Sequence, residues 1–176
     1  KKAIGYLRKA LKPDVLSFTD QAAGTRLLAD LLLSDKQYDE SIKTYYQWLD
    51  FTGEKESNIY LRIASAYMEM KQYQKVIEPA DMAISMQDKA KPNAGPYTLK
   101  FSAYFEMKNN KKAIEVLETT VQLFPSEKRW WTYLAQFYSM EEQYDKALVT
   151  LEVAAMQGML DSANEFKLLS QLYSNA

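Results

Sequence analysis

Two pairs of adjacent carboxylates, Asp39-Glu40 and Glu141-Glu142, are the residues whose type and spacing come nearest to acid–base chemistry. The sequence contains no histidine and no cysteine, which excludes a Ser-His or Cys-His nucleophile and a thiolate zinc site. Both pairs fall in polar segments between expected helices, where solvated helix ends are the simpler interpretation. We therefore expect a protein that is not an enzyme, with no catalytic residue, no metal site and no cofactor.

Charge and glycine spacing also argue against nucleic acid, nucleotides and membranes as ligands. The 22 basic and 23 acidic residues give a net charge of −1, so the chain has no overall field that attracts a polyanion. The paired lysines at 1–2 and 111–112 have acidic residues nearby and are typical of ordinary exposed faces. The five glycines are isolated, so none forms a phosphate-binding loop. Apolar runs such as the leucines at 31–33 are far shorter than the ~20 residues of a membrane-spanning helix.

The elements that position the side chains follow from apolar residues at helical spacing. Within 125–158, Trp131, Leu134, Ala135 and Tyr138 are spaced i, i+3, i+4 and i+7, which places them on one face of a helix. A polar turn follows, and then a second apolar face of similar length. The stretch therefore predicts two antiparallel helices with Trp131 in the core.

This helix pair recurs along the chain. The large residue that closes each first helix recurs at intervals of 35, 37, 34 and 35 residues, at Leu32, Tyr67, Tyr104, Tyr138 and Tyr173. A nearly constant period of this length indicates a repeat architecture. The sequence predicts one array over 1–176: the second helix of a truncated repeat at 1–12, repeats at 20–53, 57–90, 94–125 and 128–159, and the first helix of a further repeat at 161–176.

In the repeat at 128–159, large and small residues alternate in a recognisable order. They are Trp131, Leu134, Ala135, Tyr138, Ala147, Leu151 and Ala154. In these residues the chain resembles the tetratricopeptide repeat (TPR) family, and the resemblance implies an all-α fold, a right-handed α-solenoid of antiparallel helix pairs. Small residues allow helices to cross closely. Phe101 and Trp48 depart from the pattern, because the equivalent positions of other repeats carry alanine.

A narrower resemblance covers about a third of the chain. The tract RWWTYLAQFYSMEEQYDKALVTLEVAAMQGML, followed by LLSQLY, is similar to repeat proteins associated with TonB-type energy-transduction systems in the envelope of Gram-negative bacteria. This similarity implies an accessory protein of the bacterial periplasm.

The TPR resemblance also implies a peptide groove lined by the first helix of each pair. Its residues would be Arg26, Asp30, Leu33, Leu61, Met68, Glu69, Phe105, Glu106, Arg129 and Gln136. Leu33, Met68 and Phe105 would form an apolar row beside the acidic Glu69 and Glu106. Such a surface suits a peptide with apolar anchors and a basic residue. The alternative is that the row is half-buried against the second helices, since an amphipathic stripe is often core.

The sequence therefore favours a non-catalytic scaffold that binds a protein or peptide as a module of a larger protein. Two alternatives stay open: a self-association module, and the non-catalytic part of an enzyme or envelope transport complex. In the last helix, Phe166, Leu169 and Tyr173 form one stripe and Leu168 and Leu172 form another. We expect one stripe to pack inward and the other to face outward, with Tyr173 in the core. The outward contact residues would be Phe166, Leu168 and Leu172, and a further helix is expected beyond the last residue.

Overall fold

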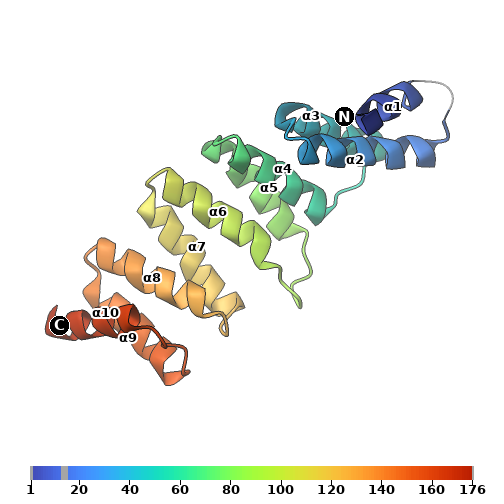
Figure 1. The fold of residues 1–176 in the computed structure, drawn as a ribbon. Helices are drawn as coiled ribbons and strands as arrows, with labels where there is room; N and C mark the ends of the chain where they lie inside the picture. Colours follow the sequence, from blue (N-terminus) through green and yellow to red (C-terminus); the bar gives the residue numbers. More distant parts are fainter. Residues whose placement is uncertain (1, 13–15, 176) are drawn as a thin grey trace. The chain divides into compact units, whose positions relative to one another are not determined.

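The computed structural model describes residues 2–12 and 16–175, and every regular element in this part of the chain is an α-helix (Figure 1). The helices are α1 (Lys2–Ala10), α2 (Phe18–Ser34), α3 (Tyr38–Thr52), α4 (Ser57–Glu69), α5 (Tyr73–Ser85), α6 (Ala94–Glu106), α7 (Asn110–Leu123), α8 (Lys128–Met140), α9 (Tyr144–Met156) and α10 (Ala163–Asn175). The expected all-α class is confirmed.

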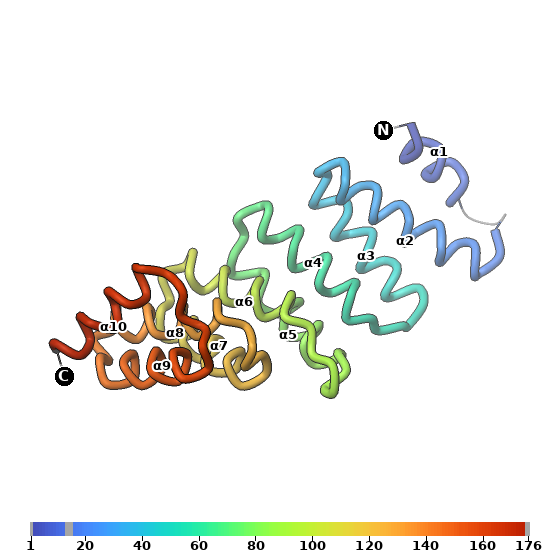
Figure 2. The backbone as a smooth tube through the Cα atoms, turned by 60° about the horizontal axis from the view of Figure 1, so that its bottom comes forward, coloured from blue at the N-terminus to red at the C-terminus, as the bar shows by residue number. Residues whose placement is uncertain are grey.

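The chain divides into two compact units, one running to Leu99 and the other from Lys100, with the boundary inside α6. In the first unit α2 pairs with α3 and α4 with α5, while α1 packs on α2 and α3 on α4. In the second unit α8 pairs with α9, α7 packs on α8, and α10 packs on α9. The backbone trace follows each pair through its tight turn (Figure 2). Each unit is thus built from helices that pack mainly on their neighbours in sequence.

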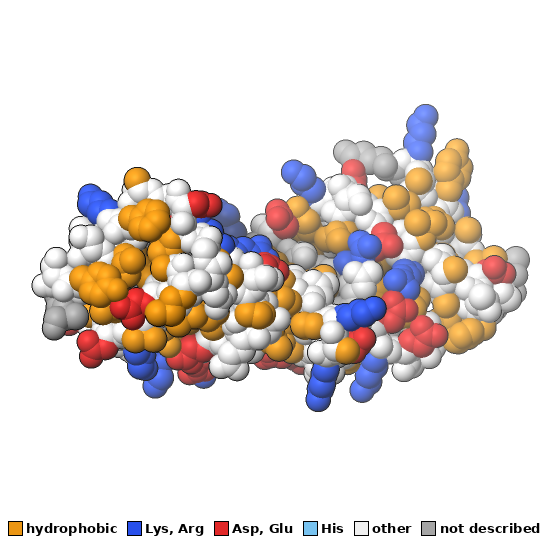
Figure 3. Space-filling model, turned by 90° about the horizontal axis from the view of Figure 1, so that it is seen from below, with side chains coloured by type: hydrophobic (Ala, Val, Ile, Leu, Met, Phe, Trp, Pro, Cys, Tyr) orange, Lys and Arg blue, Asp and Glu red, His pale blue; other side chains and the backbone are white. Residues whose placement is uncertain are grey.

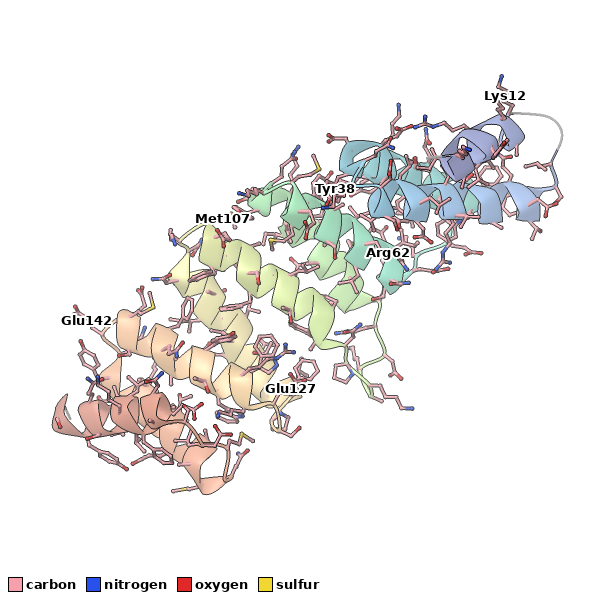
Figure 4. The ribbon with its side chains drawn as sticks, in the orientation of Figure 1. Lys12, Tyr38, Arg62, Met107, Glu127 and Glu142 are labelled. Carbon is pink, nitrogen blue, oxygen red and sulfur yellow. The ribbon has the colours of Figure 1, made fainter. Side chains whose placement is uncertain are left out.

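The turns inside the helix pairs share one backbone conformation. Lys36, Lys71, Lys108 and Glu142 have φ values of 60°, 57°, 58° and 58°, in the left-handed region that non-glycine residues seldom adopt. In each turn the next backbone N–H donates to the carbonyl of the large residue that closes the first helix. These bonds join Gln37 to Leu32, Gln72 to Tyr67, Asn109 to Tyr104, and Gln143 to Tyr138. The recurring residues found in the sequence therefore occupy equivalent positions in four turns, one of which is marked by Glu142 in Figure 4.

The core of the first unit contains small residues where helices approach closely. Ala29, Ala64 and Ala66 are fully buried, together with Ile59 and Ile63. This burial is as expected for TPR-like helix crossings, where a larger side chain would separate the backbones.

A glycine lies where the segment after α1 approaches α2. A Cβ atom at Gly24 would lie 2.7 Å from Cδ2 of Leu11, closer than two carbon atoms in van der Waals contact. Gly24 therefore leaves room for the Leu11 side chain, whose tip would have to shift if a larger residue replaced the glycine.

In the second unit the core tryptophan is Trp130, so the prediction for Trp131 is wrong. Trp130 is 1% exposed. Trp131 is only partly buried, and its indole N–H donates to the carbonyl oxygen of Pro125 over 2.9 Å. The inward stripe of α8 includes Trp130, Leu134 and Phe137, spaced i, i+4 and i+7, and this register places Trp131 at its margin.

The last helix also differs from the prediction. Leu172, expected to face outward, is buried, and Leu168 is partly buried. Tyr173, expected to pack inward, is exposed and donates a hydrogen bond from its hydroxyl to Glu152 of α9 over 2.6 Å. Phe166 is exposed, as expected of a contact residue. Leu172 and Tyr173 thus have the opposite exposure to that predicted, because α10 turns its Leu172 side toward the unit.

Candidate peptide-binding face

Arg26 on α2 is held by contacts within the first unit. Its guanidinium donates to Glu56 over 3.0 Å, in an ion pair whose shortest distance is 2.9 Å. The same group lies 5.5 Å from the ring centroid of the buried Trp48. A guanidinium in this position makes an ion pair with the carboxylate and a cation–π contact with the aromatic ring. Arg26 therefore offers little unpaired charge to a ligand.

Asp30, one helical turn further along α2, is also paired. It accepts a hydrogen bond of 2.5 Å from the hydroxyl of Tyr45 and an ion pair of 3.3 Å from Arg62. Arg62 projects from α4 (Figure 4). Burial, aided by the Asp30 carboxylate, raises the pKa of Tyr45 above its ordinary value, so the phenol stays protonated as a donor. The Tyr45–Asp30–Arg62 network links α3, α2 and α4.

The remaining predicted groove residues of the first unit are apolar or lie at a helix end. Leu33, Leu61 and Met68 are partly buried, and Leu33 packs against the hydrophobic core. Glu69 is exposed at the end of α4, and the Tyr38 hydroxyl approaches its carboxylate at 3.5 Å. For Leu33 the alternative of a half-buried core residue is therefore the better description.

The second unit presents a cluster of aromatic rings that we call the aromatic patch: Phe101 and Phe105 of α6 and Trp130, Tyr133 and Phe137 of α8. Phe101 is buried at its centre. Its ring centroid lies 5.4 Å from that of Tyr133, 5.5 Å from Phe137 and 6.4 Å from Trp130. Phe105 lies 5.9 Å from Phe137. Phe105 and Tyr133 are each 40% exposed, so two surface rings are supported by buried ones.

The charges beside the aromatic patch differ in whether they are paired. Arg129 bonds to Glu127 over 2.8 Å and lies 4.4 Å above the Trp130 ring. The Lys108 ammonium lies 5.1 Å from the Phe105 centroid, and among the described residues it has no carboxylate partner. Glu106 is exposed at the end of α6, next to Phe105.

Of the ten predicted groove residues, six lie in the first unit and four in the second: Phe105, Glu106, Arg129 and Gln136. The second-unit positions are all exposed. Sequence reasoning missed Tyr133, Phe137 and Lys108. A signal was present in the departure at Phe101, because a phenylalanine in a column of alanines needs a compensating partner. The pairs 101/105 and 133/137 also repeat an aromatic i, i+4 spacing on two helices.

The described residues contain neither a candidate membrane-spanning helix nor a candidate metal centre. None of the helices there combines the length and apolarity that a bilayer crossing demands. No group of three or more acidic side chains in the same ranges is placed to hold a metal ion. On the face shown in Figure 3, basic and acidic side chains are interspersed among hydrophobic ones.

Comparison with known families and structures agrees with this architecture. The family model for ChAPs (Chs5p-Arf1p-binding proteins) matches residues 28–172. No curated protein sequence matches the chain.

Solved structures give the same fold at low identity. A crystal structure of MamA shares 19% identity with a TM-score of 0.68, covering 88% of this chain and 86% of MamA. A MamA fragment from Desulfovibrio magneticus shares 18% identity at a TM-score of 0.64, with 92% and 87% covered. YrrB, described as a TPR protein with an unusual peptide-binding site, shares 16% identity at a TM-score of 0.65, with 96% and 82% covered. The predicted TPR-type α-solenoid class is thus confirmed.

Proposed function

The chain belongs to the ChAPs family, and we propose that it is a non-catalytic scaffold module of a larger protein that binds a protein or peptide. The name of the family describes proteins that bind Chs5p and Arf1p, and one structural neighbour is described as having a peptide-binding site. Both descriptions support a protein ligand in preference to a small metabolite.

The observation that carries the proposal is the exposure of Phe105 and Tyr133 on a rigid aromatic base. Each ring is 40% exposed, whereas the neighbouring rings of Phe101 and Phe137 are buried in the same unit. Exposed aromatic residues that are already ordered are typical anchors in protein interfaces, since little side-chain entropy is lost when they bind.

The test is capture of partners by the complete protein from its native organism, repeated with Phe105→Ala and Tyr133→Ser. The proposal predicts that capture weakens while helical circular dichroism is unchanged, because each anchor contributes about 1–3 kcal/mol to binding. Val149→Ala is the matched control, since Val149 is an exposed apolar residue of α9 outside the face. Equal capture by all four proteins would exclude this face, and loss of helicity in both test variants would assign the two residues to the core.

Self-association is the second candidate. Phe166 is exposed on α10 and Leu168 of the same helix is partly buried, and a second molecule could cover both. Light scattering over a range of concentrations tests this directly. A mass that stays monomeric at all concentrations would remove self-association, whereas a dimer lost in Phe166→Ser would support it. The placement in the bacterial periplasm and the link to TonB-type systems stay predictions of the sequence resemblance.

A further inference from the structure

We propose that the aromatic patch of the second unit binds a peptide segment in which an aromatic or branched aliphatic side chain lies next to a carboxylate. The inference rests on the proposed function and goes further, because it names the face and the chemistry of the ligand. It also differs from the expectation that the peptide carries a basic residue.

Arg26 and Asp30, two of the charged groove residues predicted in the first unit, are poor ligand contacts because their charges already have partners. Arg26 is paired with Glu56, and Asp30 is bonded by both Tyr45 and Arg62. A charged ligand would compete with these existing partners, which reduces the gain from the new contact.

The aromatic patch has the opposite character. Phe105 and Tyr133 are exposed, and the buried Phe101 lies 6.3 Å from the first ring and 5.4 Å from the second. Phe137 supports Phe105 from α8. An apolar side chain placed on these two rings would cover surface now in water without rearranging the core, which is the behaviour of a preorganised anchor site.

The sign of the ligand's charge follows from Lys108. Its backbone is fixed beside Phe105 by the turn, because its N–H donates to the Phe105 carbonyl oxygen over 2.9 Å. Its ammonium lies over the Phe105 ring with no carboxylate partner among the described side chains, so a carboxylate next to the anchor would meet an unpaired cation.

Two further charges near the patch are Arg129, already paired with Glu127, and the exposed Glu106. Glu106 would oppose an acidic ligand. The Lys108 ammonium, however, is the group placed on the exposed ring itself, and electrostatic complementarity at that point favours a carboxylate.

The experiment uses the whole chain and pools of short fluorescein-labelled peptides, read by fluorescence anisotropy. Every peptide has a central Phe, Leu or Trp flanked by Asp and Glu in the acidic pool, by Lys in the basic pool, and by Ser in the neutral pool. The acidic pool should bind about ten-fold more tightly than the basic pool, a free-energy difference of about 1.4 kcal/mol. Phe105→Ala and Tyr133→Ser should each weaken acidic-pool binding about ten-fold, whereas Val149→Ala should leave it unchanged.

Lys108→Gln separates the charge from the anchor. It should remove the preference for the acidic pool over the neutral pool while neutral-pool binding persists. Tighter binding of the basic pool, or an acidic preference that survives Lys108→Gln, would overturn the inference and leave the proposed function standing. Binding that is indifferent to Phe105 and Tyr133 would overturn the choice of face, and failure of partner capture by the complete protein is the separate result that would remove the proposed function.

Discussion

Glu165→Gln should weaken the packing of α10 on the second unit. The loss of stability can be worked out from the contacts of the buried Glu165 carboxylate. Glu165 accepts hydrogen bonds from the backbone N–H groups of Asp161 and Ser162 over 3.1 and 3.0 Å. Its own N–H donates to the Ser162 hydroxyl over 3.3 Å, which completes a capping box at the start of α10. The Lys128 ammonium of α8 lies 2.9 Å from it. The carboxylate thus fixes the first turn of α10 and joins that turn to α8.

The charge on Glu165 is strongly favoured by these contacts. Burial alone would raise the pKa of Glu165, but the bonds from Lys128, Ser162 and Asp161 outweigh it and lower the pKa to about 2. Relative to an ordinary value near 4.5, this shift corresponds to about 3 kcal/mol of stabilisation at neutral pH, at 1.36 kcal/mol per pH unit. Because the pKa is lowered on folding, the stabilisation is fully present above about pH 4.5 and is lost as the pH falls toward 2.

The assay is amide hydrogen exchange of α10 as a function of pH. Glu165→Gln should lower the opening free energy of α10 by about 2–3 kcal/mol at pH 7, and the difference from the unmodified protein should shrink as the pH falls below about 4.5. The control is Asp161→Asn, because Asp161 contacts the same Lys128 ammonium but its side chain is 78% exposed, against 8% for Glu165. The control should cost less than about 0.5 kcal/mol, as exposed pairs do. Equal effects of the two substitutions, or a Glu165→Gln effect that does not change with pH, would refute this reasoning.

Three further predictions concern the turn conformation and the helix packing. Lys71→Gly should stabilise the first unit by about 0.5–1 kcal/mol in urea denaturation, because a non-glycine residue in the left-handed conformation is strained. The control, Lys75→Gly inside α5, should instead lower the stability by about 1 kcal/mol. A loss of stability in both variants would contradict the turn argument. Trp130→Phe should lower the thermal midpoint more than Trp131→Phe, because only Trp130 is fully buried; the reverse order would restore the register expected from sequence. Ala135→Arg should cost several kcal/mol, since it places an unpaired charge at a fully buried position, and an unchanged thermal midpoint would count against the helix-pair packing.

The spacing of apolar residues predicted the helix pairs because apolar side chains at helical spacing form one face that is buried on folding. Leu134, Ala135 and Tyr138 are all buried as the stripe required. The same argument failed for Trp131, because an apolar stripe is wide and adjacent tryptophans can exchange places when the helix rotates slightly. The predictions for Leu172 and Tyr173 were wrong for the same reason. Helix existence depends on the whole pattern, whereas the inward residue depends on a rotation that the pattern does not fix.

The candidate site was harder to predict, because exposure and pairing are properties of side chains that meet from different helices. Arg26 and Asp30 were identified as groove residues by their spacing on one helix. Their partners Glu56 and Arg62 lie on the next pair or just before it, and no spacing rule within a helix connects them. Periodicity therefore proposed a candidate face but left open which charges on it are free.

Asp30 of the first unit and Phe101 of the second unit occupy neighbouring positions of the repeat and have different surroundings. This contrast bears on how such a scaffold acquires a ligand. Asp30 in the first unit is hydrogen-bonded by a tyrosine and ion-paired with an arginine, while its side chain stays 31% exposed. Phe101 occupies a position that is alanine in other repeats, and it carries the exposed rings of Phe105 and Tyr133. Because a repeat needs only its neighbours for stability, one repeat can keep its surface rings unburied while others keep their polar side chains paired. A binding face can therefore be confined to one part of such an array, and the Phe105 and Lys108 variants measure whether it is confined there in this protein.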